Sequence, residues 1–337
     1  GVVSKTDQLI GIFTGGRYNS ITNNTIYDLN SATLNNTNGT TSLNTAAVTG
    51  ISEYCNLCYS HDINKNIIYN LNATNALFTG SVNGIKTITP NPGGNIKINN
   101  NFIYDLKLNQ SSVGASVYGI NSTAAYNTYT YNNIITIGED IPATYFGIYV
   151  SETGNGYKYE FFNTVNLKGS PSSGAYPSYA YYTDFLGSYQ RHVKNNIFTN
   201  RRSNTSTASG KHYAAYYNYD LTGPSNLLQD NNNYFVTGTG GVLAGTYSGT
   251  LREVNQLPIF TNTYDISSIS VDPLFANASG STPVDFIPSS PVLAASNINL
   301  ITNFANYPSY STDFTGRARN VTSSSMGAYE ISGVAKI

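Results

Sequence analysis

The stretch Asn101-Phe102-Ile103-Tyr104-Asp105-Leu106 decides the fold, because the chain repeats it along most of its length. Further copies of this phrase, close at first and looser later, begin at Asn24, Asn66, Asn133, Asn163, Asn196 and Asn233. The steps between successive copies are 42, 35, 32, 30, 33 and 37 residues. A recurrence of about 20 to 50 residues is typical of repeat architectures in which each unit stacks on the next.

A second phrase, Gly-Ile, lies between successive asparagines. Its copies are Gly11-Ile12, Gly50-Ile51, Gly84-Ile85, Gly119-Ile120 and Gly147-Ile148, with weaker versions at Ala180-Tyr181-Tyr182 and Ala215-Tyr216-Tyr217. The run from this phrase to the next asparagine stays between 13 and 18 residues, whereas the opposite run varies more and reaches 26 residues. One side of each unit is therefore structural, and the other side carries loops of variable length.

The runs within each unit are short, β-branched and aromatic, and they are bounded by Asn, Gly, Ser and Thr, which predicts strands. Propeller blades would need four antiparallel strands with hairpins, and no hairpins are visible. We therefore predict an all-β chain: a right-handed parallel β-helix (solenoid) of roughly eight coils with a C-terminal closing segment. The repeated asparagines should stack as a hydrogen-bonded ladder at a bend where Asn tolerates left-handed geometry.

Two hydrophobic columns should point into the core of this solenoid. The first comprises Ile26, Ile68, Ile103 and Ile134. The second comprises Leu29, Leu71, Leu106 and Ile137. Equivalent side chains of successive coils would lie about 4.8 Å apart, the spacing of neighbouring strands.

Composition points to an extracellular protein. Only 10% of the 337 residues are charged and the net charge is −1, so electrostatics favour neither nucleic acid nor membrane binding. The chain has 29 tyrosines and no tryptophan, and it shows no signal peptide, apolar spanning run or initiator methionine. We expect a secreted or cell-surface protein, represented by a mature or excised fragment, without direct membrane insertion.

The only cysteines form the motif Cys55-Asn56-Leu57-Cys58. A structural zinc site needs four ligands, and His61 is the only nearby histidine. A redox pair would be expected to open a helix in a thioredoxin-like unit, which this chain does not show. A local disulfide or two free thiols at a bend are the readings we favour.

The tail carries a family resemblance. Its phrases are Val271-Asp272-Pro273-Leu274-Phe275, Asp285-Phe286, Pro288-Ser289-Ser290-Pro291-Val292, Asp313-Phe314-Thr315-Gly316-Arg317-Ala318-Arg319 and Met326-Gly327-Ala328-Tyr329-Glu330. In this order they resemble the C-terminal closure of secreted bacterial right-handed β-helix proteins of the pectate-lyase-like superfamily. The chain departs from that pattern at Ala294-Ala295-Ser296 and at Ser325, where the family commonly has Ile-Asp and Asp.

This resemblance implies a final coil and then a strand that covers the open core. We divide the chain accordingly into coils at 1–260, a final coil and closure of the same domain at 261–331, and a linker at 332–337. In relatives a further domain or a type IX secretion sorting domain often follows. Such a fold hosts adhesins, lyases and other surface proteins, so the resemblance alone does not select a function.

Evidence for catalysis is sparse. Asp28 and Asp105 occupy the same slot of the repeat two coils apart, and such a ladder could bind a cation, although it belongs to the structural phrase. A lyase-like site would use Arg191 or Lys194 as the base and Asp184 as a metal or uronate partner. No cluster of three acidic residues accompanies them, so ordinary surface charges are the favoured reading. No cofactor is predicted, and calcium is an ion that these carboxylates could bind.

A column of tyrosines is the candidate contact surface. Tyr149, Tyr182 and Tyr217 fall in near-equivalent slots, with the basic residues Arg202 and Lys211 nearby. Outward tyrosines would form an aromatic strip for a polysaccharide or cell-surface glycan, whereas stacked rings would merely stabilise the sheet. We expect an extracellular module for adhesion, structural spacing or glycan contact without catalysis. The alternatives are a polysaccharide lyase or glycoside hydrolase, and a self-assembling fibre subunit that docks through its first coil or joins further domains of a parent chain.

Overall fold

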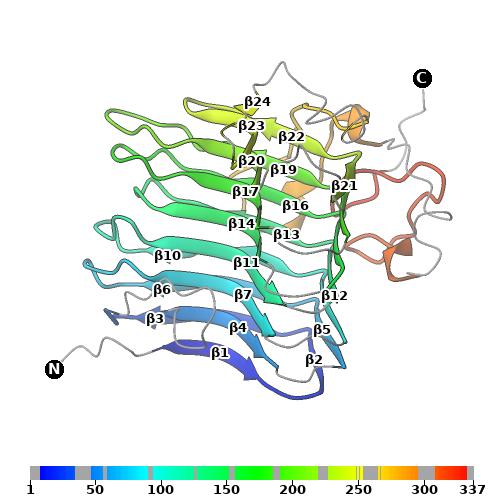
Figure 1. The fold of residues 1–337 in the computed structure, drawn as a ribbon, viewed down its shortest axis with the longest axis horizontal. Helices are drawn as coiled ribbons and strands as arrows, with labels where there is room; N and C mark the ends of the chain where they lie inside the picture. The colour runs from blue at the N-terminus through cyan, green and yellow to red at the C-terminus, as the bar shows by residue number, and fades with distance from the viewer. Residues whose placement is uncertain are drawn as a thin grey trace.

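The chain forms a parallel β-solenoid, as predicted (Figure 1). The computed structural model describes residues 8–34, 47–55, 59–89, 94–124, 127–151, 156–184, 190–218, 227–247, 249, 251–252, 265, 267–294 and 308–331. Each coil contributes one stretch to each of three sheets, here called A, B and C in the order in which the chain enters them. No helix of this described part is long and apolar enough to cross a membrane.

Sheet A has nine strands, eight of them parallel: β1 (Leu9–Thr14), β4 (Val48–Tyr54), β7 (Ser81–Thr89), β11 (Ser116–Ala124), β14 (Thr144–Ser151), β17 (Ser178–Asp184), β20 (His212–Tyr217), β23 (Gly241–Thr246) and the antiparallel β24 (Leu251–Arg252). Sheet B has seven: β2 (Tyr18–Thr22), β5 (Ser60–Asn64), β8 (Asn95–Asn99), β12 (Asn127–Tyr131), β15 (Lys158–Phe161), β18 (Arg191–Lys194) and β21 (Leu227–Asp230). Sheet C has eight: β3 (Thr25–Ser31), β6 (Ile67–Ala73), β9 (Phe102–Tyr104), β10 (Leu106–Leu108), β13 (Ile134–Ile137), β16 (Thr164–Leu167), β19 (Ile197–Asn200) and β22 (Asn233–Val236). Because sheet B has only seven strands, fewer coils are complete in the described residues than the roughly eight expected.

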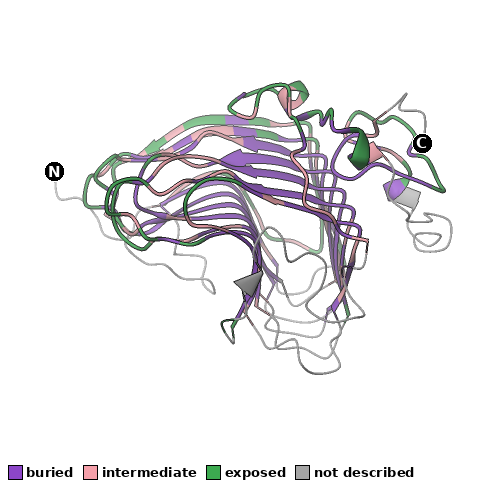
Figure 2. Cartoon of the chain, turned by 90° about the horizontal axis from the view of Figure 1, so that it is seen from above, coloured by how far each residue is buried: buried purple, intermediate pink, exposed green. Residues whose placement is uncertain are grey.

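The Gly-Ile phrase marks a bend in sheet A, whose strands curve in the view from above (Figure 2). Phe146 and Tyr149 are three residues apart, yet both lie on the outer face with ring centroids 5.2 Å apart. Simple strand alternation would place them on opposite faces, so it is broken at Gly147 between them. The earlier coils leave no room for a side chain at this position, because a Cβ on the equivalent Gly119 would lie 2.5 Å from Ile135 Cγ2 of sheet C. The two repeated phrases therefore pack against each other across the core, which explains their near-constant spacing.

The asparagine ladder stands at the bend between sheets B and C. The backbone N–H and side-chain amide of Asn101 both donate to Asn133 Oδ1, at 3.1 and 3.0 Å, and the same amide donates to Ile63 O at 2.9 Å. Asn24, Asn66, Asn101, Asn133, Asn163 and Asn196 all repeat the bond to the next rung. The left-handed residue is the one before each ladder asparagine, such as Asn132 with φ 54°, and not the ladder residue as predicted.

Some predicted positions were wrong by one residue. Asn232, not Asn233, continues the ladder from Asn196, and the ladder ends where Asn232 N–H donates to Ser268 Oγ. Ile135, not Ile134, stands opposite Ile103 in the inward column. Such a shift of one residue moves a side chain to the other face of its strand.

The tail follows the last coil and then packs against the outside of the solenoid. Residues 265 and 267–271 lie on the last coil, where Ile269 N–H donates to Asn232 O. The following segment contains the 3-10 helices η1 (Pro283–Phe286), η2 (Pro291–Ala294) and η3 (Pro308–Ser311), and it packs on the outside of sheets B and C. Among the described residues it therefore covers the outer face of the coils and does not form a strand over the open core. The predicted linker at 332–337 lies outside the described residues.

Phe102 and Ile134 show why the tail docks where it does. Both are outward positions of sheet C, and they form one buried cluster with Phe286, Ala328 and Tyr329 of the tail. Outward residues of a solenoid are normally polar, so these apolar side chains need a cover. The apolar residues of the tail motifs supply this cover. A polar residue of the same motifs stabilises the tail itself, since Asp313 accepts hydrogen bonds from the N–H groups of Thr315, Arg317 and Glu330.

Candidate functional site

The structure does not bring the predicted lyase residues together. Arg191 lies on β18 of sheet B with its side chain fully buried inside the solenoid, where a polymer could not reach it. Lys194 is half-buried on the same strand, and it pairs with Phe161 and Asp230 in the register of the sheet. Asp184 ends β17 of sheet A and accepts hydrogen bonds from the phenols of Tyr149 and Tyr182, both at 2.9 Å. Asp184 thus braces tyrosines and does not face Arg191 as a metal or uronate partner.

The predicted tyrosine strip exists with one wrong member. Tyr149 stacks on Tyr182 with centroids 5.1 Å apart, and Tyr182 stacks on Tyr216 at 5.5 Å. Tyr217 stands one residue further on and is fully buried in the core, with its hydroxyl 3.4 Å from that of Tyr234. A second column stacks beside the first at the bend of sheet A: Tyr118, Phe146, Tyr179 and Tyr213.

These rings are poorly suited to stacking on a sugar. Tyr118, Phe146 and Tyr149 are only 7 to 8% exposed, because their faces stack on one another from coil to coil. The hydroxyl group of Tyr118 in the second column is also shielded from water, and this burial raises its pKa to about 12. The strip therefore stabilises the bend of sheet A, which is the structural alternative considered from the sequence.

Of the two basic residues assigned to the strip, Arg202 cannot contribute to its surface. Arg202 is fully buried and donates to the carbonyl oxygens of Glu139, Lys168 and Ile141, while its guanidinium carbon lies 4.3 Å from the centre of the Tyr145 ring. It fastens the loops between sheets C and A. Lys211 is exposed just before β20.

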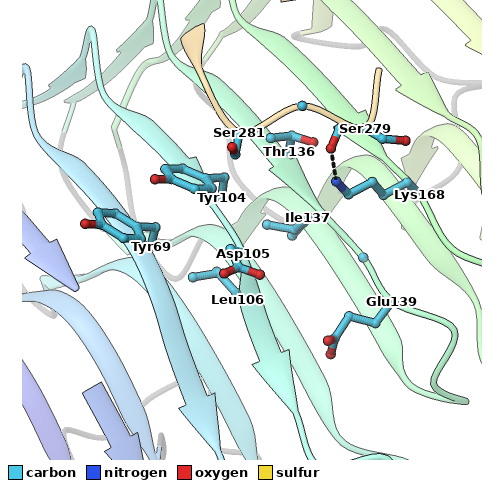
Figure 3. A pocket seen from close by; sticks show the side chains of 12 residues that line it. Tyr69, Tyr104, Asp105, Leu106, Thr136, Ile137, Glu139, Lys168, Ser279 and Ser281 are labelled. Atoms are coloured by element: carbon cyan, nitrogen blue, oxygen red, sulfur yellow. Dashed lines mark hydrogen bonds between the residues drawn. The ribbon is translucent and has the colours of Figure 1, made fainter. Parts of the chain in front are cut away.

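The outer face of sheet C carries a hollow of about 380 Å³ (Figure 3). Its lining residues are Tyr69, Tyr104, Asp105, Leu106, Thr136, Ile137, Gly138, Glu139, Lys168, Ser279, Gly280 and Ser281. A volume of this size suits a small ligand. The wall formed by residues 279–281 belongs to the tail, so the hollow exists only when the tail is docked.

One coil with small side chains creates this hollow. Tyr27, Tyr69 and Tyr104 stack in a column along sheet C, with centroids 5.2 and 4.9 Å apart. Thr136 is the next residue in register after Tyr104, and it ends the column of rings. Ile137 pairs with Leu167 of the next coil, so Gly138 occupies the position that Lys168 has in that coil. A second outward side chain is therefore missing from the coil that carries Thr136. Two large-to-small changes on one coil leave the space open.

The lining offers both charges and hydroxyl groups. Glu139 Oε2 accepts the Leu108 N–H at 3.0 Å, and burial, with Asp105 close by, raises the pKa of Glu139. Lys168 Nζ donates to Ser279 O at 3.0 Å, and burial lowers the pKa of this ammonium group. Asp105 pairs with Lys107 at 2.8 Å. The hollow therefore combines aromatic rings with acceptors and donors, an arrangement that can hold a polyhydroxylated molecule.

In the predicted cation-binding ladder at Asp28 and Asp105, a lysine side chain already supplies a positive charge. Asn70 donates to Asp28 between them, and Lys107 Nζ lies 3.2 Å from Asn70 Oδ1 as well as close to Asp105. An ammonium group thus occupies the position that a metal ion would take. Asp28, Asn70 and Asp105 all have positive φ, which supports the structural role favoured from the sequence.

The cysteine motif contains a disulfide, one of the two readings favoured from the sequence. Cys55 is disulfide-bonded, and the only other cysteine of the chain, Cys58, lies outside the described residues. Cys55 itself is buried in the core just after β4.

Sequence reasoning missed Glu139 and Lys168, because neither belongs to a repeated phrase. A signal was present in the coil at 133–139, where Thr136 and Gly138 interrupt columns of larger residues. No protein-family model, no curated protein and no solved structure matches the chain.

Proposed function

We propose that the protein is an extracellular glycan-contact module, secreted or held at a cell surface, and that the hollow on sheet C takes the sugar. The observation that carries the proposal is the lining itself: stacked tyrosines, two carboxylates, an ammonium group and two serines around about 380 Å³. Sugars present C–H faces to aromatic rings and hydroxyl groups to such acceptors and donors. A rigid rod that carries such a site would serve in adhesion or in the spacing of cell-surface material.

Two further features support an extracellular setting. The disulfide at Cys55 suits an oxidising compartment, and the low charged fraction suits a surface rich in Asn, Ser and Thr. The tail phrases add the resemblance to secreted bacterial β-helix proteins of the pectate-lyase-like superfamily, including those exported by type IX secretion. A parent chain with further domains fits this proposal, and so does self-association through the first coil.

Binding to a panel of neutral and acidic oligosaccharides, followed by calorimetry and by NMR of the sugar, tests the proposal. Thr136→Tyr should abolish binding, because it extends the tyrosine column into the hollow while using a residue that three neighbouring coils already carry at this position. Tyr104→Ala should weaken binding roughly tenfold or more, as expected for one lost aromatic contact of about 1.4 kcal/mol or more.

Tyr27→Ala is the matched control, because Tyr27 belongs to the same stack but does not line the hollow. It should bind as the unmodified protein does. Equal binding by Thr136→Tyr and the unmodified protein, with both folded by circular dichroism, would refute the site. An absence of binding to every glycan of the panel would refute the function.

A second candidate is glycoside hydrolysis in the same hollow. Glu139 has a raised pKa and lines the hollow together with Asp105, and glycosidases pair a protonated carboxyl group with an ionised one. Release of reducing ends from a bound oligosaccharide, lost in Glu139→Gln while binding is kept, would favour this candidate. Binding without product formation by the unmodified protein would favour the contact module.

A further inference from the structure

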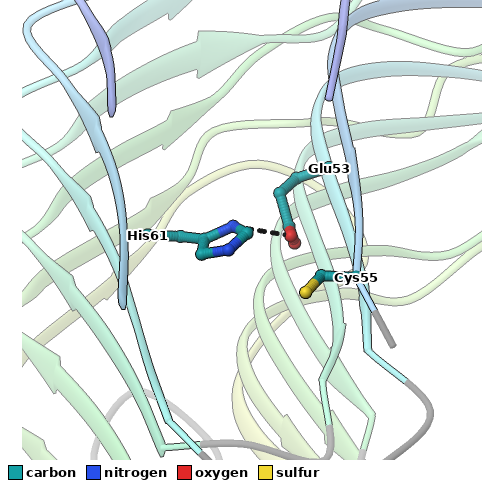
Figure 4. Close-up of side chains that lie close together, drawn as sticks. All are labelled: Glu53, Cys55 and His61. Carbon is teal, nitrogen blue, oxygen red and sulfur yellow. Dashed lines mark ion pairs between the residues drawn. The ribbon is translucent and has the colours of Figure 1, made fainter. Parts of the chain in front are cut away.

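The first described coils enclose a cluster of donor atoms that glycan contact does not use (Figure 4). Glu53 lies near the end of β4 in sheet A, Cys55 follows that strand, and His61 points inward from β5 of sheet B. The three side chains are 0 to 3% exposed. One ligand atom from each of them lies within 4.8 Å of the others.

Hydrogen bonds already orient the imidazole in this cluster. His61 Nδ1 lies 2.8 Å from Glu53 Oε1, and His61 Nε2 lies 2.9 Å from the carbonyl oxygen of Gly16 in the preceding coil. Cys55 Sγ lies 2.9 Å from the same carbonyl oxygen. The Nε2–H bond to this backbone carbonyl leaves Nδ1 as the atom that faces the carboxylate. This is the outer contact that commonly fixes the tautomer of a metal-binding histidine.

The donor set is one that zinc prefers. Thiolate, imidazole and carboxylate are its usual ligands, with bonds of about 2.0–2.3 Å, which place the ligand atoms of a tetrahedral site roughly 3–4 Å apart. The spacing of the cluster is close to this, so small movements of side chains would suffice. What the cluster lacks in its oxidised form is the thiolate, because Cys55 is disulfide-bonded.

We propose that Glu53, Cys55 and His61 form a zinc site when the disulfide is opened. A dithiol reductant supplies two electrons and two protons, is itself oxidised to a disulfide, and converts the protein disulfide into two thiols. With a phosphine the two electrons come from phosphorus, and water supplies the two protons and the oxygen of the phosphine oxide. Zn²⁺ then replaces the thiol proton of Cys55 and the proton shared between His61 Nδ1 and Glu53, and these protons leave to solvent. Three protein ligands leave a fourth position for water or another donor. The segment after β4 would thus be held by a local disulfide in oxidising surroundings, and in reducing ones by a metal ion that joins β4 of sheet A to β5 of sheet B.

The variant Cys58→Ser tests the proposal without a reductant, because it leaves Cys55 as a free thiol. Titration of this variant with Co²⁺ should give one equivalent of binding, with a sulfur-to-cobalt charge-transfer band and intense visible bands of tetrahedral cobalt. Addition of Zn²⁺ should bleach these bands and raise the melting temperature. The oxidised protein should show neither effect.

The double variants Cys55→Ser/Cys58→Ser and Cys58→Ser/His61→Ala should lose the bands. His192→Ala in the Cys58→Ser background is the matched control, because His192 stacks on Tyr159 away from the cluster, and it should keep them. If Cys58→Ser does not fold, the same titration is made on protein reduced with a phosphine. A folded protein with a free Cys55 thiol that gives no cobalt bands, or bands that survive His61→Ala, would overturn the proposal.

Discussion

The guanidinium carbon of Arg319 lies 3.9 Å from the centre of the Phe162 ring, so that the tail is fastened to the solenoid by a buried cation over an aromatic face. Arg319 also donates to Asn132 Oδ1 at 2.8 Å and to the carbonyl oxygens of Gly327 and Ala328. Phe162 itself has a left-handed backbone with φ 56° at the bend before ladder residue Asn163. The tail is therefore anchored at the same bend that carries the ladder.

Arg319→Ala should lower the free energy of unfolding by about 3 kcal/mol, because it leaves buried carbonyl and amide oxygens without their donor. Arg319→Lys should rescue little of this loss, since an ammonium group lacks the planar fork. Denaturant unfolding followed by circular dichroism measures the change. Arg317→Ala is the control, because Arg317 is exposed, and it should cost far less. Equal losses for both variants would contradict the anchoring role.

Asn133→Ala should destabilise the solenoid by about 2–4 kcal/mol, because the N–H of Asn101, its side-chain amide and Ile98 O all lose a partner in a buried site. Asn30→Ala removes an exposed asparagine of sheet C and should cost only a few tenths of a kcal/mol. Hydrogen exchange should show the loss concentrated at the coils on either side of Asn133. Protection lost uniformly along the whole chain would argue against a ladder of local contacts.

Asp265 predicts how stability depends on pH. Burial raises its pKa from 3.8 to about 7, with Asp230 adding to the shift, while the hydroxyl groups of Ser268 and Tyr234 donate to it and oppose the shift. The folded protein therefore keeps this proton up to about pH 7, whereas the unfolded chain releases it near pH 4. Unfolding releases a proton within this window, so the free energy of unfolding should fall as pH rises from 4 to 7.

Asp265→Asn should flatten that slope, which unfolding curves collected at several pH values would reveal. The exposed Asp28→Asn should leave it in place. The raised pKa values of Glu53 and His61 act in the same direction, because both groups hold protons more tightly in the folded state. Some slope should therefore remain in Asp265→Asn, and an unchanged slope would contradict the assignment.

Gly119→Ala should cost about 1–3 kcal/mol through overpacking, because the added methyl group would overlap Ile135 and the carbonyl oxygen of Gly147. Ile135→Val alone should cost about 1 kcal/mol. Combined with Gly119→Ala it should cost less than the sum, since the smaller side chain relieves part of the overlap. A thermodynamic cycle on melting data measures this coupling, and simple additivity would show that the two side chains do not meet.

The repeat could be predicted because stacking demands it. A coil adds its hydrogen bonds to the next only in one register, so Asn101, Asn133 and Asn163 had to recur at similar spacing. The predicted positions were wrong where similar residue types recur out of register with the coils. Ala215-Tyr216-Tyr217 repeats the letters of Ala180-Tyr181-Tyr182, but Tyr182 pairs with Tyr216, because inward packing and not residue identity sets the register.

The hollow on sheet C could not be predicted, because its walls come from opposite ends of the sequence. Tyr69 and Ser281 are brought together only by the docking of the tail on the outer face of the coils. Likewise, Arg191 reads as a surface base in the sequence, and only the register of β18 shows that its side chain points inward. Periodicity along the chain indicates which residues stack, but not which solvent-facing columns will be covered.

The asparagine ladder has a direction. Each rung from Asn66 to Asn196 receives two donors from the coil before it and gives two to the coil after it, as Asn133 shows. Each of these coils therefore carries a complete set of ladder contacts. A whole coil could therefore be inserted or deleted as a cassette without leaving an unmatched amide, whereas a change of a few residues within a coil could not. Evolution of this rod would be expected to proceed by cassettes, with its length as the variable trait.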